Sequence, residues 1–554
     1  MGHSTHYRQD IVVAVAVAAC LLAAAVGEAS ASSCVGFDLH HRSSPVVLRW
    51  AEARGHPALA AEWPAKGSPE YYSELSRHDR AHLARRGLAA ADGGLLTFAD
   101  GNITYQYIGS LYYAEVKLGT PNATFLVALD TGSDLFWVPC DCKQCASIRN
   151  ATGGQDVPEL RPYSPRLSST SKPVTCADEL CDMPNACAAG GGANNGSCPY
   201  AVRYVSANTS SSGVLVEDVL HLTRERPGPG GAAAATEDVK APVVFGCGQV
   251  QTGVFLDGGA FDGLLGLGMD KVSVPSVLAA KGLVASDSFS MCFGDDGVGR
   301  INFGDAGGGA GQQSETPFVV AAGSTRPTYN VSFTAINAGS KSAPVEFAAV
   351  MDSGTSFTYL NDPEYTELAT NFNSEIRERR ANFSSGGSAG RFPFEYCYRL
   401  SPNQTEVQLP IVSLTTAGGG ALFPVTDPII ALYDRVSARA IGYCLAILKS
   451  DISINIVGQN FMTGLKVVFN RERSVLGWEK FDCYKNARAA DAPDASPSPG
   501  PAPARPRPTT LTPKQNDADN RYPGAAPVPR SAGSARGQGM GGLLSLLLAA
   551  AALV

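Results

Sequence analysis

The residues best suited to chemistry form a short motif that occurs twice. Asp130-Thr131-Gly132-Ser133 follows the apolar run Phe125–Leu129, and Asp352-Ser353-Gly354-Thr355 follows Phe347–Met351. With average composition, Asp-[Ser/Thr]-Gly-[Ser/Thr] is expected by chance in only about a few per cent of chains this long, and twice far more rarely. Each copy is predicted to end a strand in a tight turn, where backbone N–H groups hold the carboxylate and glycine permits the close approach.

Two carboxylates that such turns bring together act as a pair. At about 3 Å they cannot both be ionised, so one pKa falls, the other rises, and the pair shares one proton and titrates as a unit. The charged member takes a proton from a water molecule while the protonated member polarises a carbonyl group. If the two turns meet, the motifs predict general acid–base hydrolysis of a peptide without a metal, a cofactor or a covalent intermediate.

The elements that must position these turns are predicted to be mainly β. From Tyr105 onward, short β-rich runs are separated by Gly and Pro, and one segment, Pro363–Arg379, has apolar residues at helical spacing. Two loops rich in Gly or Ala, 224–240 and 304–313, interrupt the pattern, and the second is the expected junction between two halves. The β-rich runs are Tyr112–Leu118, Phe125–Leu129, Val214–Leu222, Val243–Phe245, Val331–Ile336, Phe347–Met351 and Lys466–Phe469.

Over residues 105–485 the sequence resembles the pepsin-like aspartic proteases. Besides the two motifs, the similarity rests on Leu118-Gly-Thr-Pro121, on Trp137, and on the apolar-apolar-Gly segments within Phe261–Gly268 and Ile454–Met462. The cysteine-rich insert after Asp130 is similar to that of the plant nepenthesin-like subgroup, and residues 37–43 are similar to propeptides of its anchored members. The resemblance implies an all-β, bilobal fold with the active-site cleft between the lobes.

The resemblance also implies a role for each motif residue. Asp130 and Asp352 would form the catalytic dyad, with Gly132 and Gly354 as N–H donors to their inner oxygens. Ser133 and Thr355 would donate hydroxyl hydrogen bonds to the outer oxygens, while Thr131 and Ser353 would brace the turns across their interface. Tyr204 matches the flap tyrosine that closes over substrate, supported by Trp137; the alternative is an ordinary strand aromatic. The family's usual Tyr-Gly-Asp-Gly-Ser is replaced here by Tyr-Val-Ser-Ala-Asn.

The two ends of the chain predict export and attachment to a membrane. Arg8, the apolar run Ile11–Val26 and Ala29-x-Ala31 are typical of a secretory signal peptide, and the run is short for a membrane anchor. At the other end, small residues at 531–534, a spacer and the apolar tail Leu543–Val554 follow the order of a GPI-anchor signal, with Ser531 as the candidate attachment site. The alternative for the tail is an apolar end without a function.

Cysteine usage agrees with export. Of 14 cysteines, Cys20 and Cys34 lie in segments expected to be removed, which leaves an even number. Cys142-x-x-Cys145 suggests zinc or a redox pair as one alternative, but disulfides are expected in an oxidising compartment and no histidine lies at ligand spacing. The pairing cannot be deduced from spacing. Eight N-glycosylation sequons also suit an exported surface: Asn102, Asn122, Asn150, Asn195, Asn208, Asn330, Asn382 and Asn403.

Composition and segment texture complete the predicted organisation. The 554 residues are 44% apolar and 17% charged with a net charge of −7, which excludes wholesale disorder and a highly basic nucleic-acid binder. Eleven prolines between Asp491 and Arg530 predict an extended stalk. The expected order is a signal peptide (1–31), a propeptide (32–100), an N-terminal catalytic lobe (101–312), a C-terminal catalytic lobe (313–485), the Pro-rich stalk (486–531) and the GPI-anchor signal (532–554).

These observations predict a secreted, GPI-anchored aspartic endopeptidase on the extracellular face of the plasma membrane. It would be a monomer that acts on polypeptide substrates at acidic pH and needs no cofactor or metal. It would bind the membrane through its lipid anchor, and it would not bind nucleic acid. The alternative is a binding or inhibitor protein that keeps the fold without hydrolysing anything, and the two intact Asp motifs argue against it.

Overall fold

The computed structural model describes residues 35–41, 44–53, 67–76, 79, 112–145, 162–181, 187, 196–204, 209–226, 235–256, 262–293, 298–307, 313–319, 327–383, 392–402, 404–434, 439–480 and 512–515. The chain divides into one unit, Met1–Asn516, and a second, Asp517–Val554, and all described residues belong to the first. The predicted signal peptide (1–31) and anchor signal (532–554) lie outside the described residues.

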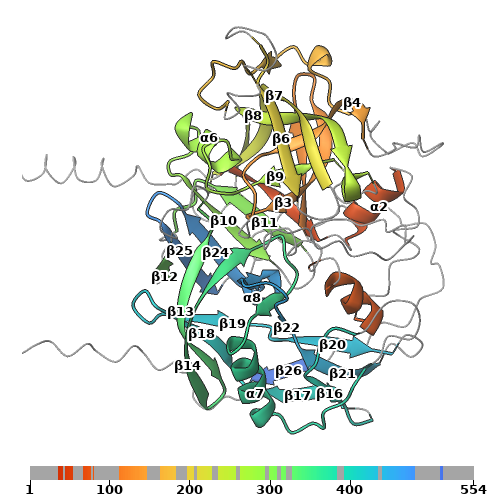
Figure 1. The fold of residues 1–554 in the computed structure, drawn as a ribbon, viewed down its shortest axis with the longest axis vertical. Coiled ribbons are helices and arrows are strands. Elements are labelled where there is room, and N and C mark those ends of the chain that lie inside the picture. Colours follow the sequence, from red (N-terminus) through yellow and green to blue (C-terminus); the bar gives the residue numbers. More distant parts are fainter. Residues whose placement is uncertain are drawn as a thin grey trace, which may run out of the picture. The chain divides into compact units, whose positions relative to one another are not determined.

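The largest sheet contains fourteen strands (Figure 1). Its order is β12-β25-β24-β10-β11-β1-β2-β3-β9-β4-β8-β7-β5, and β6 pairs with β7 off this path. The strands are β1 (Val35–His41), β2 (Tyr112–Leu118), β3 (Ala123–Asp130), β4 (Trp137–Gln144), β5 (Lys172–Pro173), β6 (Pro199–Tyr204), β7 (Thr209–Arg226), β8 (Ala235–Thr252), β9 (Leu264–Gly266), β10 (Ser288–Phe293), β11 (Val298–Phe303), β12 (Ser314–Pro317), β24 (Leu465–Asn470) and β25 (Val475–Lys480). Because β12, β24 and β25 join this sheet, it crosses the predicted lobe boundary at 312/313.

A seven-stranded sheet, in the order β19-β18-β13-β14-β23-β15-β22, carries the second motif. Its strands are β13 (Asn330–Ala338), β14 (Lys341–Asp352), β15 (Thr358–Leu360), β18 (Val412–Thr416), β19 (Leu422–Val425), β22 (Ile447–Lys449) and β23 (Asn455–Gly458). Two smaller sheets contain β16 (Cys397–Arg399), β20 (Ile429–Tyr433) and β21 (Ala440–Leu445), and β17 (Glu406–Leu409) with β26 (Thr512–Gln515). The structure thus confirms the mainly β fold class, and one buried apolar cluster contains Leu129 of the large sheet and Met351 of the second.

Helices are few and short in the described part of the chain. They are α2 (Pro45–Ala53), α6 (Val274–Ala280), α7 (Glu364–Glu375), α8 (Gln459–Met462), the 3-10 turns η1 (Pro165–Leu167) and η3 (Gly253–Phe255), and helical residues 69–76. The helix predicted over Pro363–Arg379 forms as α7, with Tyr365, Leu368 and Phe372 buried. It ends earlier than predicted because Ile376 has an extended backbone.

Strands occur at all the predicted β-rich runs, but one predicted loop is largely strand. The hairpin β7–β8 extends to Arg226 and resumes at Ala235, well inside the expected loop 224–240. On this stretch Val239 is buried whereas Glu237 and Lys240 are exposed. The alternation of buried and exposed residues is that of a strand with one solvent-exposed face, so both ends of the predicted loop are strand, while its Gly- and Ala-rich centre, 227–234, lies outside the described residues.

A strand also forms in the predicted propeptide, where none was expected. β1 lies between β11 and β2 in the middle of the large sheet, with Leu39 opposite Gly299 on one side and Ala114 on the other. Leu39 is completely buried. Polar residues such as Asp38 and His40 disguise the strand in the sequence, because both edges of the strand, rather than an apolar face, hold it in place.

The predicted Pro-rich stalk contributes one short strand. β26 pairs in parallel with β17, with Glu406 opposite Thr512 and Leu409 opposite Gln515. Within 486–531, predicted as an extended stalk, Thr512–Gln515 is therefore extended and also paired with another strand. β17 would otherwise expose an unpaired edge, which readily accepts another strand. The rest of the predicted stalk lies outside the described residues.

Candidate active site

The first motif stands at the end of β3, beside a parallel neighbour. β9 pairs with β3 so that Asp130 lies opposite Gly266. The side chain of Asp130 is 4% exposed, and its Oδ1 accepts a hydrogen bond from Gly132 N at 2.8 Å. The carbonyl oxygen of Asp130 accepts another from Leu267 N at 2.9 Å. Backbone N–H groups therefore fix both the side-chain carboxylate and the main-chain carbonyl of Asp130.

The second motif repeats this arrangement on the other sheet. β14 pairs in parallel with β23, and Asp352 lies opposite Gly458. Asp352 is fully buried; its Oδ1 accepts from Gly354 N at 3.0 Å and its Oδ2 from the hydroxyl of Thr355 at 2.5 Å. A buried carboxylate requires such donors, because removing it from water without them is costly.

The glycines on the neighbouring strands are needed for the close contact with each turn. A Cβ on Gly266 would lie 2.3 Å from the carbonyl carbon of Asp134, and one on Gly458 would lie 2.1 Å from the carbonyl oxygen of Phe357. No side chain fits at these positions without moving backbone. The apolar-apolar-Gly segments recognised in the sequence thus have a physical reason in the structure.

The two turns meet through the side chain of Thr131. Its hydroxyl donates to the carbonyl oxygen of Met351 at 3.2 Å and accepts from Ser353 N at 3.1 Å. The hydroxyl of Ser353 lies 3.5 Å from the same oxygen. The structure therefore brings both motifs to one place, with Thr131 and Ser353 linking them.

Ser133 differs from the role that the resemblance implied. Its hydroxyl is buried and makes no hydrogen bond among the described residues, whereas Thr355 on the other turn donates to its aspartate. The two turns are therefore related but not identical in their hydrogen bonds.

The candidate flap residues lie on neighbouring strands. Trp137 begins β4, is completely buried and packs against Phe255 with ring centroids 4.9 Å apart. The same apolar cluster contains Tyr200, and Val202 packs against it; both belong to β6. Tyr204 ends β6 and pairs with Thr209 of β7, and its side chain lies outside the described residues. Trp137 thus packs under the strand that leads to Tyr204.

Two buried acids near the turns were missed in the sequence. Asp262 Oδ2 accepts from Leu126 N at 2.9 Å and from the indole N–H of Trp50 at 2.8 Å. Asp79, in the predicted propeptide, accepts from the backbone N–H groups of Ser356 and Phe357, directly after the second motif. The Phe261-Asp262-Gly263 sequence was a signal for the first, since Asp before Gly beside a motif strand is typical of a structural turn. No local signal marks Asp79.

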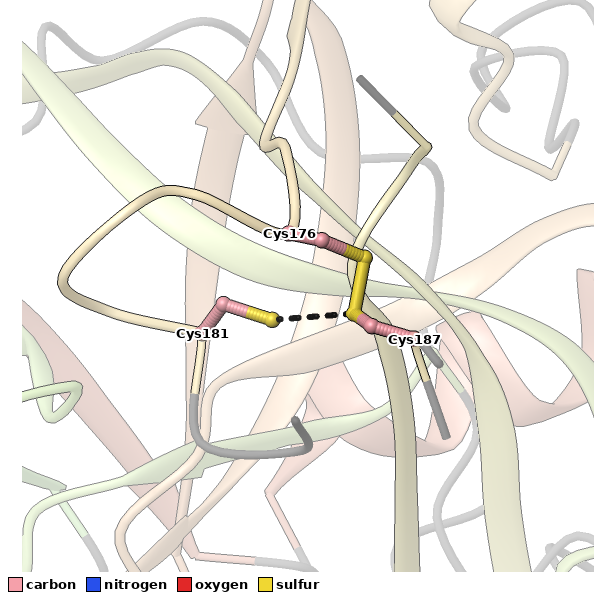
Figure 2. A group of neighbouring side chains, drawn as sticks. All are labelled: Cys176, Cys181 and Cys187. Carbon is pink, nitrogen blue, oxygen red and sulfur yellow. Dashed lines mark hydrogen bonds between the residues drawn. A yellow bond between two sulfur atoms is a disulfide. The ribbon is translucent and has the colours of Figure 1, made fainter. Parts of the chain in front are cut away.

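The cysteine-rich region forms disulfides, which confirms that interpretation. The pairs are Cys140–Cys247, Cys142–Cys145, Cys176–Cys187, Cys181–Cys198 and Cys397–Cys444, and Cys292 is also disulfide-bonded. Figure 2 shows Cys176, Cys181 and Cys187, whose sulfur atoms lie within 4.8 Å of one another. All three are in disulfides, so none is the free thiolate that a metal needs.

Of the predicted glycosylation sites, three are described. Asn122 and Asn382 are exposed, whereas Asn330 is half-buried in β13 and donates its amide to the hydroxyl of Thr328 at 2.9 Å. The sites outside the described residues are Asn102, Asn150, Asn195, Asn208 and Asn403, and the candidate anchor site Ser531 is also outside. Within the described part of the chain, no helix is long and apolar enough to cross a membrane.

Two family models match overlapping parts of the chain. The model described as "Xylanase inhibitor N-terminal" matches residues 112–305, and the model described as "Eukaryotic aspartyl protease" matches residues 236–480. The first match contains Asp130 and the second contains Asp352. Together they span both motifs and the sheets that carry them.

The chain is also similar to individual proteins in sequence and to one solved structure in fold. The chain is 46% identical to "Aspartyl protease family protein 1" and 37% identical to "Aspartic proteinase-like protein 1", both of Arabidopsis thaliana, over 82% and 80% of each chain. It is 23% identical to "Aspartic proteinase nepenthesin-2" of Nepenthes gracilis, over 80% of this chain and 94% of that one. In fold it resembles conglutin gamma from lupine seeds (TM-score 0.50, 18% identity, 69% of this chain and 94% of that one). The chain belongs to the family of pepsin-like aspartyl proteases and their plant, nepenthesin-like relatives.

Proposed function

We propose that this protein is an aspartic endopeptidase that hydrolyses peptide bonds with Asp130 and Asp352 as its catalytic pair. The observation that carries the proposal is the meeting of the two Asp-Gly turns through Thr131 and Ser353. Each aspartate is buried, held by one backbone N–H, and placed at the end of a strand fixed by a parallel neighbour.

The proposed mechanism follows from this placement. If the joined turns hold the two buried carboxyl groups close together, the pair shares one proton, because two negative charges at short range repel strongly. The ionised carboxylate accepts a proton from the attacking water molecule, and the protonated one donates a hydrogen bond to the peptide carbonyl. The backbone donors at Gly132 and Gly354 keep both groups in position throughout. Activity is expected at acidic pH, where the pair retains its shared proton.

The test uses the full chain, exposed to acid so that the predicted propeptide can be removed. Cleavage of a mixed peptide substrate is followed from about pH 3 to 7, with and without a transition-state inhibitor that bears a central hydroxyl. Wild-type protein should show inhibitable cleavage with an acidic optimum. Asp130→Asn and Asp352→Asn should each lower kcat at least about 1,000-fold, since general acid–base catalysis supplies factors of this size.

A matched control keeps a loss of activity from being mistaken for a loss of fold. Asp238→Asn makes the same change at an exposed carboxylate on β8, and this variant should cleave normally; denaturant unfolding of all three variants shows that each one is folded. A folded, processed wild-type protein that cleaves nothing between pH 3 and 7 would overturn the proposal.

The second candidate is a binding or inhibitor protein that keeps the fold. The match of residues 112–305 to the xylanase-inhibitor model favours it, as does the Ser133 hydroxyl that does not reach Asp130. The same cleavage assay separates the two functions. If Asp130→Asn and wild-type protein are equally inert while both bind a partner, the binding function is the correct one.

We further propose that the protein is exported and attached to the extracellular face of the plasma membrane by a GPI anchor at Ser531. Export is supported by the signal-like start of the sequence and by the five disulfides of which both cysteines are described. The anchor is supported by the small residues that precede the apolar tail. A phospholipase that cleaves GPI anchors should release the protein from plant membranes. Release should be lost when residues 543–554 are deleted, because the anchor is then never attached. Membrane attachment that resists the enzyme would contradict the proposal.

A further inference from the structure

A piece of the predicted propeptide packs against β20 and against the residues that follow the second motif. Residues 67–76 include the short red-brown helix near β20 in Figure 1. At its start, Gly67 O accepts a hydrogen bond from Tyr433 N of β20 at 2.9 Å. The hydroxyl of Tyr72 donates to Ala431 O at 3.0 Å, and its ring contacts Phe357 with centroids 6.4 Å apart. This segment is therefore docked beside the candidate active site.

The segment places a carboxylate on backbone donors next to the catalytic turn. Asp79 is completely buried; its Oδ1 accepts from Ser356 N at 2.8 Å and its Oδ2 from Phe357 N at 2.9 Å. The hydroxyl of Tyr359 lies 3.3 Å from Oδ2 and 3.2 Å from Ser76 O, so it shares its one hydrogen between two acceptors of this segment and can donate it to a ligand once the segment is displaced. These donors follow directly after Thr355, which holds Asp352. Hydrogen bonds to an ionised acceptor are stronger than neutral ones, so this set of donors selects a carboxylate.

A second observation at the same place points to a ligand. The hydroxyl of Ser356 is buried and makes no hydrogen bond among the described residues, although the residue is only 3% exposed. Buried polar groups are nearly always paired in a finished structure. An unpaired hydroxyl beside three donors suits a ligand that brings more polar groups than Asp79 does, such as the backbone of an extended peptide.

We propose that Ser356 N, Phe357 N and the Tyr359 hydroxyl form a carboxylate subsite that binds an acidic side chain of the substrate. In the unprocessed chain Asp79 occupies this subsite; once the segment is displaced, an Asp or Glu of the substrate takes its place. The inference rests on the proposed function for its substrate. The donors themselves belong to the stretch from the catalytic turn into β15, not to the propeptide, and remain when the segment leaves.

The first experiment measures binding and does not depend on hydrolysis. The full chain is processed and freed of its propeptide, and two synthetic peptides of residues 67–79 are compared, one with Asp and one with Asn at position 79. The Asp peptide should bind about 10-fold more tightly by fluorescence polarisation, a factor typical of a charge-assisted contact. Equal binding of the two peptides would overturn the carboxylate subsite.

The second experiment measures substrate preference. Peptides that differ only by Glu or Gln are tested at each position around the cleaved bond, at about pH 5, where Glu is mostly ionised. One position should favour Glu about 10-fold in kcat/KM, and Tyr359→Phe should narrow this ratio. The matched variant Tyr365→Phe, which removes another hydroxyl from the same half, should leave the ratio as in wild type.

The two experiments distinguish the possible failures. Glu and Gln cleaved equally at every position would overturn the substrate assignment even if the Asp peptide binds. A protein that cleaves nothing but still prefers the Asp peptide would retain the carboxylate subsite and lose the proposed function.

Discussion

At the scale of single residues, the Thr131 hydroxyl joins the two turns in both directions, as donor to Met351 O and acceptor from Ser353 N. Thr131→Ala removes both hydrogen bonds and leaves two buried backbone groups without this partner. We expect the free energy of unfolding to fall by about 1–3 kcal/mol and activity to fall with it, because each unpaired buried group carries a cost of this order. Thr131→Ser keeps the hydroxyl and should restore most of both. Denaturant unfolding of the two variants checks this, and equal stabilities would contradict it.

Gly266 has no side chain, and this allows its strand to lie against the backbone of Asp134. In Gly266→Ala the new Cβ would lie 2.3 Å from the carbonyl carbon of Asp134, in the segment between β3 and β4, so β9 or that segment must shift. Overpacking of this kind costs about 3 kcal/mol. The melting temperature should fall by several degrees relative to Gly196→Ala, where the nearest atom is the sulfur of Cys176 at 3.9 Å. A Gly266→Ala protein as stable as the Gly196→Ala control would show that the turn tolerates the shift.

At the scale of elements, the sequence predicted the parts that depend on local pattern. The turn motifs, the two glycine segments beside them and the helix at Glu364–Glu375 carry their own signals, and the structure contains all of them. β1 was missed because its stability comes from pairing on both edges with β2 and β11, which no local pattern of Asp38 and His40 reveals. The Asp79 contact was missed for the same reason: it joins residues 277 positions apart.

The disulfides differ in how much of the chain each one restrains. Cys140–Cys247 joins β4 to β8 across 107 residues, whereas Cys142–Cys145 closes a loop of 3. A long closed loop removes more entropy from the unfolded chain, so Cys140→Ser with Cys247→Ser should lower the free energy of unfolding by about 4 kcal/mol. Cys142→Ser with Cys145→Ser should have a much smaller effect. Unfolding in denaturant under oxidising conditions measures both, and equal losses would mean that loop length does not govern stability here.

At the scale of the whole molecule, the proposed activity at low pH requires a fold that is stable there, and the protonation of two acids limits that stability. Burial alone would raise the pKa of Asp218, but hydrogen bonds from Ser168, Thr170 and Tyr163 outweigh it and lower the pKa below its ordinary value of 3.8. Burial would also raise the pKa of Asp305. The charge of Lys466, together with hydrogen bonds from Lys466 and Ser290, outweighs burial, so this pKa is lowered as well. Both carboxylates bind protons less readily in the folded than in the unfolded chain.

The sign of the resulting pH dependence follows from linkage. A lowered folded-state pKa contributes stability that is fully present above the unfolded value, about 3.8, and is lost as the pH falls through the folded value. We therefore expect the free energy of unfolding to decrease steadily below about pH 4, inside the proposed working range. Asp218→Asn should be destabilised by about 1–3 kcal/mol at pH 6, because its donors lose a charged partner. The gap between variant and wild type should close toward pH 2, as protonation removes the same charge from wild type. Denaturant unfolding at several pH values measures this gap; a gap that stays constant with pH would show that Asp218 is not the group whose protonation weakens the fold.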